Sequence, residues 1–192
     1  TVSRVINGSP SVTIETRQKV MEWVKRLNYH PNLTAQSLVR KQSYLLGIVL
    51  PEISNPYFSD VLKVVEQEAS LNGYNLIFCH TGDNVQREKH AISTLRSRQV
   101  DGLLLVPVDS GAAHLKMLRQ NNMPVVMVTR EVSGFDSVSI SHRHGGALVA
   151  RHLLETGHTH IGYIGSTKEE KFQGFLEVFT KNGIQFSDEH VI

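Results

Sequence analysis

From residue 44 onward, short runs of apolar residues alternate with longer stretches in which apolar residues recur every three or four positions. A strand buried on both faces is apolar throughout, whereas an amphipathic helix carries a single apolar stripe. The alternation therefore predicts an α/β domain: a doubly wound parallel sheet with helices on both faces. The apolar runs are LLGIVL (45–50), YNLIFC (74–79), GLLLVPV (102–108), PVVMV (124–128) and HIGYIG (160–165).

The stretches between the runs show the stripes expected of covering helices. The stripe residues are Phe58, Val61, Leu62, Val65 and Ala69 before a stop at Asn72-Gly73, and then Ala91, Ile92 and Leu95. Ligands of such sheets bind beyond the carboxyl ends of the strands. The candidate ligand loops are therefore 51–58, 80–84, 107–111, 129–131 and 141–146.

These loops do not carry the motifs of an enzyme. The first strand is followed by PEISNP, with no glycine-rich turn to cradle a dinucleotide, and GSTK (165–168) lacks the spacing of a phosphate-binding loop. Histidines at 142, 144, 158 and 160 have no nearby cysteine or carboxylate to complete a metal site. We therefore expect no catalytic residue, no cofactor and no metal.

Composition bears on the cellular compartment. Cys79 is the only cysteine, so an internal disulfide is impossible, and its place at a strand end is typical of a small buried hydrophobe. No apolar run approaches the roughly 20 residues that span a bilayer. We expect a cytoplasmic protein that does not enter a membrane.

The first 43 residues differ from the rest in charge. They hold seven basic and two acidic residues, a net charge of +5, whereas the remainder sums to −3. A basic head on a mildly acidic body is typical of a protein that binds a polyanion, although a solvated surface face would also account for the charge.

Two short helices and a weaker third segment are predicted in this head. Asn7-Gly8 ends the first helix, and Thr13 can cap the second. Their apolar stripes consist of Val2, Val5 and Ile6, and of Val20, Trp23, Val24 and Leu27. The third segment, 33–40, is too short and too polar to be a stable helix by itself.

Ordered motifs along the whole chain resemble the LacI/GalR family of bacterial repressors. The motifs are TVSRVING (1–8), TR (16–17), LNYHPN (27–32), AQSL (35–38), LGIV (46–49), NPYF (55–58), GY (73–74), VDGLL (100–104), PVV (124–126), HL (152–153), GH (157–158) and IGYIG (161–165). The resemblance implies a periplasmic-binding-protein-like α/β domain preceded by a partial all-α helix-turn-helix head and a hinge helix.

The resemblance assigns the head to DNA binding. Residues 1–7 would be the C-terminal part of a recognition helix whose preceding helix and turn are absent. Arg4 would read guanine in the major groove, and Leu38 would be an apolar wedge in the minor groove unless it packs on its own domain. The DNA-binding residues implied are Thr1, Ser3, Arg4, Asn7, Arg17, Tyr29, Asn32, Ala35, Gln36 and Leu38.

The resemblance assigns the body to binding of a small-molecule effector, a carbohydrate or related metabolite. The residues implied are Asn55, Tyr57, Phe58, Thr129, Arg130, Ser141, His142 and Lys171. Several depart from the family pattern. Thr129 stands where Asp is common, Ser141-His142 where Asp-Asn is usual, and Lys171 where Arg is common, which replaces a planar fork with a point charge. The identity of the effector is therefore open.

The sequence is thus interpreted as that of a sequence-specific transcriptional regulator, a repressor that acts as a homodimer through its effector domain. The expected segments are a partial helix-turn-helix head (1–31), a hinge helix and linker (32–43), an N-terminal effector-binding and dimerisation lobe (44–158) and the start of a truncated C-terminal lobe (159–192). The alternatives are a periplasmic-type sugar- or solute-binding protein, which shares the lobe architecture, and an α/β enzyme.

Overall fold

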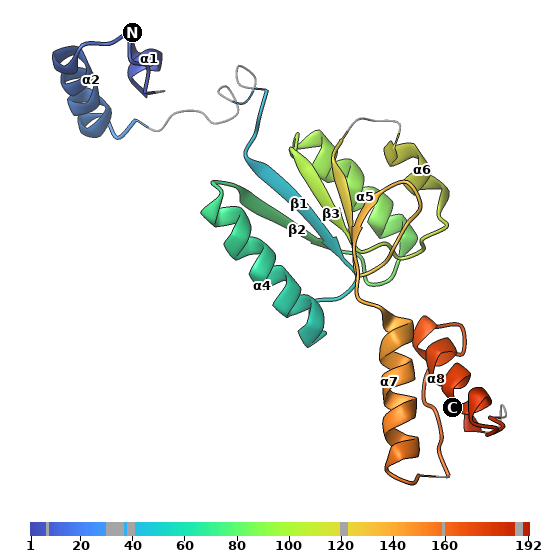
Figure 1. The fold of residues 1–192 in the computed structure, drawn as a ribbon. Helices are drawn as coiled ribbons and strands as arrows, with labels where there is room; N and C mark the ends of the chain where they lie inside the picture. Colours follow the sequence, from blue (N-terminus) through green and yellow to red (C-terminus); the bar gives the residue numbers. More distant parts are fainter. Residues whose placement is uncertain (7, 30–36, 38–40, 120–122, 159, 187–189) are drawn as a thin grey trace. The chain divides into compact units, whose positions relative to one another are not determined.

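The computed structural model describes residues 1–6, 8–29, 37, 41–119, 123–158, 160–186 and 190–192 (Figure 1). The chain divides into two compact units, Thr1–Ser137 and Val138–Ile192. The predictions for Asn7, Asn32, Ala35, Gln36 and Leu38 lie outside the described residues.

Within the described residues, five strands form one sheet in the order β2-β1-β3-β4-β5. The strands are β1 (Leu45–Leu50), β2 (Asn75–His80), β3 (Gly102–Leu105), β4 (Val125–Val128) and β5 (Asp136–Val138). β1 pairs in parallel with β2 and β3, with Leu46 opposite Leu76 on one side and Gly102 on the other, and β3 pairs in parallel with β4. The predicted parallel sheet is confirmed.

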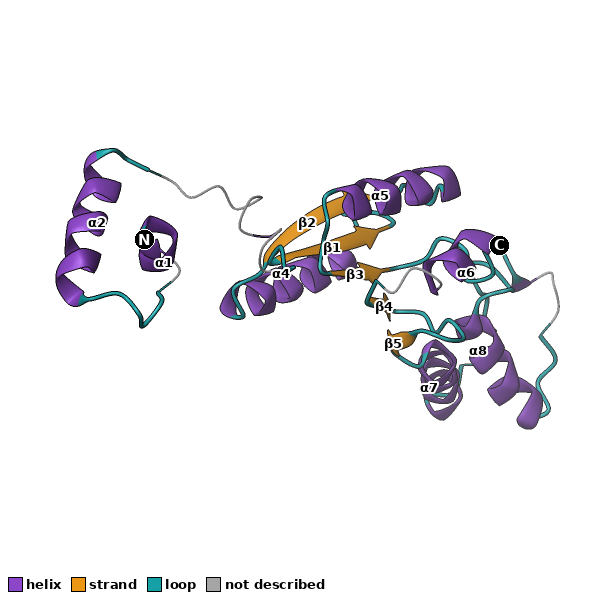
Figure 2. Cartoon of the chain, turned by 90° about the horizontal axis from the view of Figure 1, so that it is seen from above, coloured by secondary structure: helices purple, strands orange, loops and turns teal. Residues whose placement is uncertain are grey.

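Helices cover both faces of this sheet (Figures 1 and 2). The helices are α4 (Pro56–Leu71), α5 (Val85–Ser97) and α6 (Ala113–Arg119). Because neighbouring strand residues point to opposite faces, Ile48 and Leu50 pack with the α4 stripe, whereas Val49 packs with the cluster that holds α5 and α6. The uniformly apolar run LLGIVL is therefore used on both faces, as a doubly covered strand requires.

The fifth predicted strand, HIGYIG at 160–165, is wrong. Among the described residues, this run forms an isolated parallel bridge between Tyr163 and Val191, in which the N–H groups of Tyr163 and Gly165 donate to the carbonyls of His190 and Ile192 at 2.7 and 3.0 Å. An apolar run becomes a regular strand where neighbouring strands satisfy its backbone, and a single bridge satisfies too little of it. The structure has β5 instead, whose three residues are all exposed and carry no apolar pattern.

The head contains α1 (Val2–Ile6) and α2 (Ile14–Arg26). The predicted cap is confirmed, since the Thr13 side chain accepts a hydrogen bond from Thr16 N. Val5 is buried, but Trp23 and Leu27 of the predicted α2 stripe are 49% and 69% exposed. These two residues of the stripe are therefore not covered by the described part of the head.

The second unit is built on α7 (His142–Glu155) and α8 (Glu170–Lys181). Two glycines let these helices touch through their main chains. A Cβ at Gly146 would overlap the Lys171 carbonyl, and a Cβ at Gly174 would overlap the Arg143 carbonyl. An apolar cluster that includes Phe175 closes the interface.

Candidate functional site

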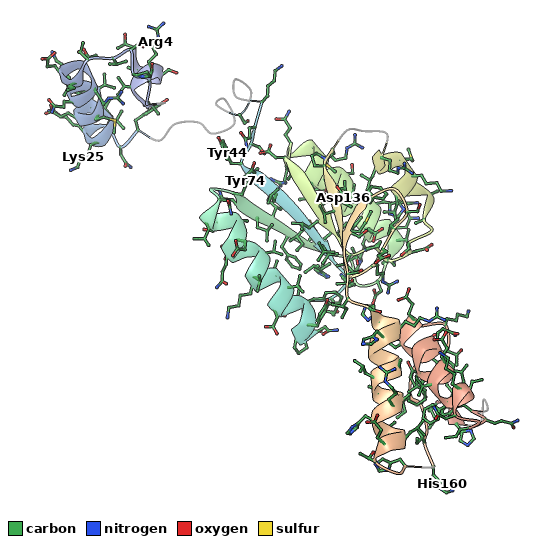
Figure 3. The ribbon with its side chains drawn as sticks, viewed as in Figure 1. Arg4, Lys25, Tyr44, Tyr74, Asp136 and His160 are labelled. Atoms are coloured by element: carbon green, nitrogen blue, oxygen red, sulfur yellow. The ribbon has the colours of Figure 1, made fainter. Side chains whose placement is uncertain are left out.

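The head presents Arg4, the predicted base-reading residue, on its surface. Arg4 lies in α1 and is exposed, as are Thr1 and Ser3 (Figure 3). The helix ends in a turn in which the Gly8 N–H donates to the Val5 carbonyl at 3.1 Å and the Ser9 N–H donates to the Arg4 carbonyl at 2.9 Å. Gly8 has φ +70°, so this pair of bonds matches a Schellman ending with glycine in the left-handed region.

Arg17, also predicted to bind DNA, makes hydrogen bonds within the head. Its side chain is half-buried and turned onto the main chain that follows α1. Nη2 donates to the Ser9 carbonyl at 2.7 Å, and Nη1 donates to the Val5 carbonyl at 3.4 Å. Tyr29, a further predicted DNA contact, is half exposed just beyond α2.

The segment that enters β1 is held by a carboxylate that the sequence analysis did not single out. Asp101 Oδ1 accepts from Ser43 N at 2.8 Å and from Ser43 Oγ at 2.9 Å, and its Oδ2 accepts from Tyr44 N at 2.9 Å. Tyr44 has φ +56° and its ring lies 5.6 Å from that of Tyr74 (Figure 3). The VDGLL motif was the available signal, but nothing in it predicts which donors its Asp meets.

The predicted effector residues of the first unit follow β1 and β4. The exposed Asn55 accepts a hydrogen bond from Tyr57 N at 3.0 Å and so caps α4. Tyr57 is 41% exposed, whereas Phe58 packs into the apolar cluster beneath α4. Thr129 is buried with φ +68°, a conformation that β-branched residues rarely adopt, and Arg130 next to it is exposed.

A second carboxylate missed by sequence reasoning holds the loop that follows β3. Glu88 in α5 is fully buried on the same helix face as Ala91, Ile92 and Leu95, although glutamate is rarely buried without a partner. Its Oε2 accepts from Val108 N at 2.6 Å, and its Oε1 lies 2.5 Å from His114 Nε2 in α6. The pair therefore joins two helices to a loop at the carboxyl end of the sheet.

The remaining predicted effector residues lie in the second unit. Ser141 caps α7 by accepting from His144 N at 3.2 Å, and His142 is half-buried. Lys171 is exposed, with Nζ 3.6 Å from Glu169 Oε2. Because the Lys171 carbonyl rests on Gly146, the structure brings the starts of α7 and α8 together.

Local contacts and burial change the pKa of several groups among the described residues. The N–H of Ser54 donates to Glu52 and lowers the pKa of that carboxyl, and burial raises the pKa of the Cys79 thiol.

No cluster of three or more His, Cys, Asp or Glu side chains suited to a metal ion occurs among the described residues. None of the described helices combines the length and apolar character needed to cross a bilayer.

Two family models match this chain, one over the head and one over the rest of the chain. Residues 43–192 match the family model of periplasmic binding proteins and the sugar-binding domain of the LacI family, and residues 1–32 match that of the lacI family of bacterial regulatory proteins. The chain is 30% identical to catabolite control protein A of Priestia megaterium over 200 residues, which cover all of this chain and 60% of that protein. It is 34% identical to the ribose operon repressor of Halalkalibacterium halodurans over 184 residues, covering 93% and 55%.

A solved structure agrees. The lac repressor dimer bound to operator and the anti-inducer ONPF superposes with a TM-score of 0.83 at 27% identity, over 96% of this chain and 58% of that one. The chain thus spans 55% to 60% of the lengths of the two relatives named above, which are named as a control protein and a repressor rather than as enzymes. By sequence and by fold, the chain belongs to the LacI family of bacterial regulatory proteins.

Proposed function

We propose that the protein carrying this sequence is a sequence-specific DNA-binding transcriptional repressor controlled by a small-molecule effector. The observation that carries this proposal is the presence, in one chain, of a segment matching the regulatory head and a segment matching the sugar-binding body. A periplasmic-type solute-binding protein would leave the basic head without a role. The two relatives named above are a control protein and a repressor, which supports a regulator that is not an enzyme; we place it in the cytoplasm because this head would bind the operators of the cell's own DNA.

In this proposal α1 is part of the recognition helix, and its exposed Arg4 reads a guanine edge. The planar guanidinium can donate to guanine O6 and N7 together. Thr1, Ser3 and Asn7 bond phosphates or neighbouring base edges, and Tyr29 lies on the same head. The hinge residues are Asn32, Ala35, Gln36 and Leu38, of which Leu38 opens a base step from the minor groove.

The body binds the effector, a carbohydrate or related metabolite, and mediates homodimerisation. The proposed contacts are Asn55, Tyr57, Phe58, Thr129, Arg130, Ser141, His142 and Lys171. A ligand that prefers one arrangement of the two lobes shifts the population of hinge states and thereby changes the DNA affinity. We divide the chain into head (1–31), hinge (32–43) and two lobes; the sequence put the lobe boundary at 158, and the packing of α7 on α8 favours one nearer Ser137.

Selection from a randomised duplex library tests the DNA-binding proposal. The protein carrying this sequence should enrich a defined operator. Arg4→Ala should then reduce discrimination against the wrong base by about 1–3 kcal/mol. Lys25→Ala, at the other end of the head, is the matched control and should leave discrimination unchanged (Figure 3). Equal losses on operator and random DNA for Arg4→Ala would contradict the assignment of Arg4.

Titration with a carbohydrate library tests the effector proposal. At least one mono- or disaccharide, or a phosphorylated derivative, should change the operator affinity of the protein. Lys171→Ala should weaken the response to that compound without changing operator affinity in its absence. A library-wide lack of response would contradict the proposed effector class.

A further inference from the structure

Arg17 was predicted to bind DNA directly, and the structure supplies a different use for it. Its guanidinium is half-buried and spans two carbonyls, those of Val5 in the last turn of α1 and Ser9 just beyond it. These carbonyls lie at the end of a helix and just beyond it, where the helix dipole is negative. A planar cation with several fixed N–H donors suits that position.

The same turn connects Arg17 to the proposed base reader. Ser9 accepts from Arg17 through its carbonyl and donates through its N–H to the Arg4 carbonyl at 2.9 Å. Gly8 closes the turn on the Val5 carbonyl, which Arg17 also contacts. Ser9 therefore links the guanidinium of Arg17 to the main chain of Arg4 through two hydrogen bonds.

The described apolar attachment of α1 to the rest of the head involves few side chains. Val5 is the one residue of α1 that is buried, so the described apolar contact that holds the helix is small. Additional hydrogen bonds from α2 are then needed to give α1 a single orientation.

We infer that Arg17 is a positioning residue for DNA recognition: it fixes the end of α1 from α2, and so sets the direction in which Arg4 meets the bases. This inference rests on the proposed function. It assigns Arg17 an effect on operator selectivity through Val5 and Ser9 rather than through a phosphate.

Arg17→Lys separates the two roles, because it keeps the positive charge and loses the planar fork. A phosphate contact would survive this change, whereas the bridge between two carbonyls would not. We expect operator affinity to fall about tenfold, the equivalent of about 1.4 kcal/mol. Affinity for random DNA should stay within about twofold, because non-specific binding follows the phosphate charge that is retained. Lys19→Arg is the matched control: this exposed residue on the same helix also keeps its charge, and both affinities should stay near wild type.

Amide exchange on the DNA-free protein supplies the second readout. In Arg17→Lys the N–H groups of Gly8 and Ser9 should exchange faster, while α2 keeps its protection. Wild-type operator affinity in Arg17→Lys, or loss of protection throughout α2, would overturn the inference. An absence of selective binding by the wild-type protein would instead overturn the proposed function, which keeps the two failures distinguishable.

Discussion

Removal of the Glu88 carboxylate is the sharpest test of how the sheet end is held together. Glu88 is fully buried and bonds Val108 N through Oε2 and His114 Nε2 through Oε1. Glu88→Ala leaves both partners without their acceptor and empties the volume of the side chain. Glu88→Gln keeps the volume and can still accept from Val108 N with its amide oxygen.

The two variants differ in expected cost. Breaking a buried pair by removing one partner costs about 3–5 kcal/mol, of which an unsatisfied backbone N–H accounts for about 1–3 kcal/mol. Glu88→Ala should therefore lose about 3–5 kcal/mol, a large part of the roughly 5–15 kcal/mol that typical proteins possess. Glu88→Gln replaces charge-assisted bonds by neutral ones and should lose about 1 kcal/mol.

Thermal and urea denaturation followed by circular dichroism measure these costs. At about 2–4 °C per kcal/mol, Glu88→Ala should lower Tm by about 6–20 °C and Glu88→Gln by a few degrees. Glu66→Ala, an exposed glutamate on α4, is the matched control and should stay within about 0.5 kcal/mol of wild type. A loss of unfolding free energy below about 1 kcal/mol for Glu88→Ala would refute the reasoning. It would mean that the desolvation penalty of the buried carboxylate cancels the stabilisation from its two hydrogen bonds.

Three further outcomes follow from the structure. The hydrogen bond that Glu177 accepts from Arg143 lowers the pKa of the Glu177 carboxyl below its ordinary value of 4.5. The pair therefore stabilises the fold above pH 4.5, and this stabilisation is lost as the pH falls through the lower pKa of the folded state. In Glu177→Gln the urea midpoint should consequently change less between pH 7 and pH 3 than in the wild type. Burial raises the pKa of Cys79, so iodoacetamide at pH 8 should modify the folded chain more slowly than the chain in urea. Gly146→Ala should destabilise the protein by about 1–3 kcal/mol or more through overlap with a main-chain carbonyl of α8, whereas Gly145→Ala, which meets open space, should stabilise it by about 0.5–1 kcal/mol in the same melting assay.

Periodicity predicted the sheet because burial on both faces leaves a strong imprint. Ile48 and Val49 face different helices, so β1 has to be apolar at successive positions. The run at 160–165 also looks like a buried strand, yet a local pattern does not reveal whether neighbouring strands are there to pair with it. β5 was missed for the opposite reason, since its exposed residues leave no apolar pattern.

The candidate site was less accessible to sequence reasoning because its polar contacts join distant positions. Asp101 meets Ser43 across 58 positions, and Glu88 meets His114 across 26. Arg17 could be recognised as basic, but only the fold shows that its guanidinium faces the carbonyls of Val5 and Ser9. Charge patterns identify a class of partner, whereas the choice between a ligand and the protein's own backbone depends on tertiary structure.

The Asp101 carboxylate has a consequence for the construction of chimeric regulators. It accepts hydrogen bonds from Ser43 and Tyr44 at the point where the chain enters β1. These two residues therefore belong structurally to the body even though they adjoin the head. A foreign head joined before Ser43 would inherit this attachment intact. A junction placed after Tyr44 would import donors that have not been matched to Asp101, and one extra residue between Ser43 and Leu45 would displace them. Gln42 Nε2 also donates to the Tyr74 hydroxyl at 2.7 Å, so the modular boundary for exchanging heads on this body lies between Lys41 and Gln42.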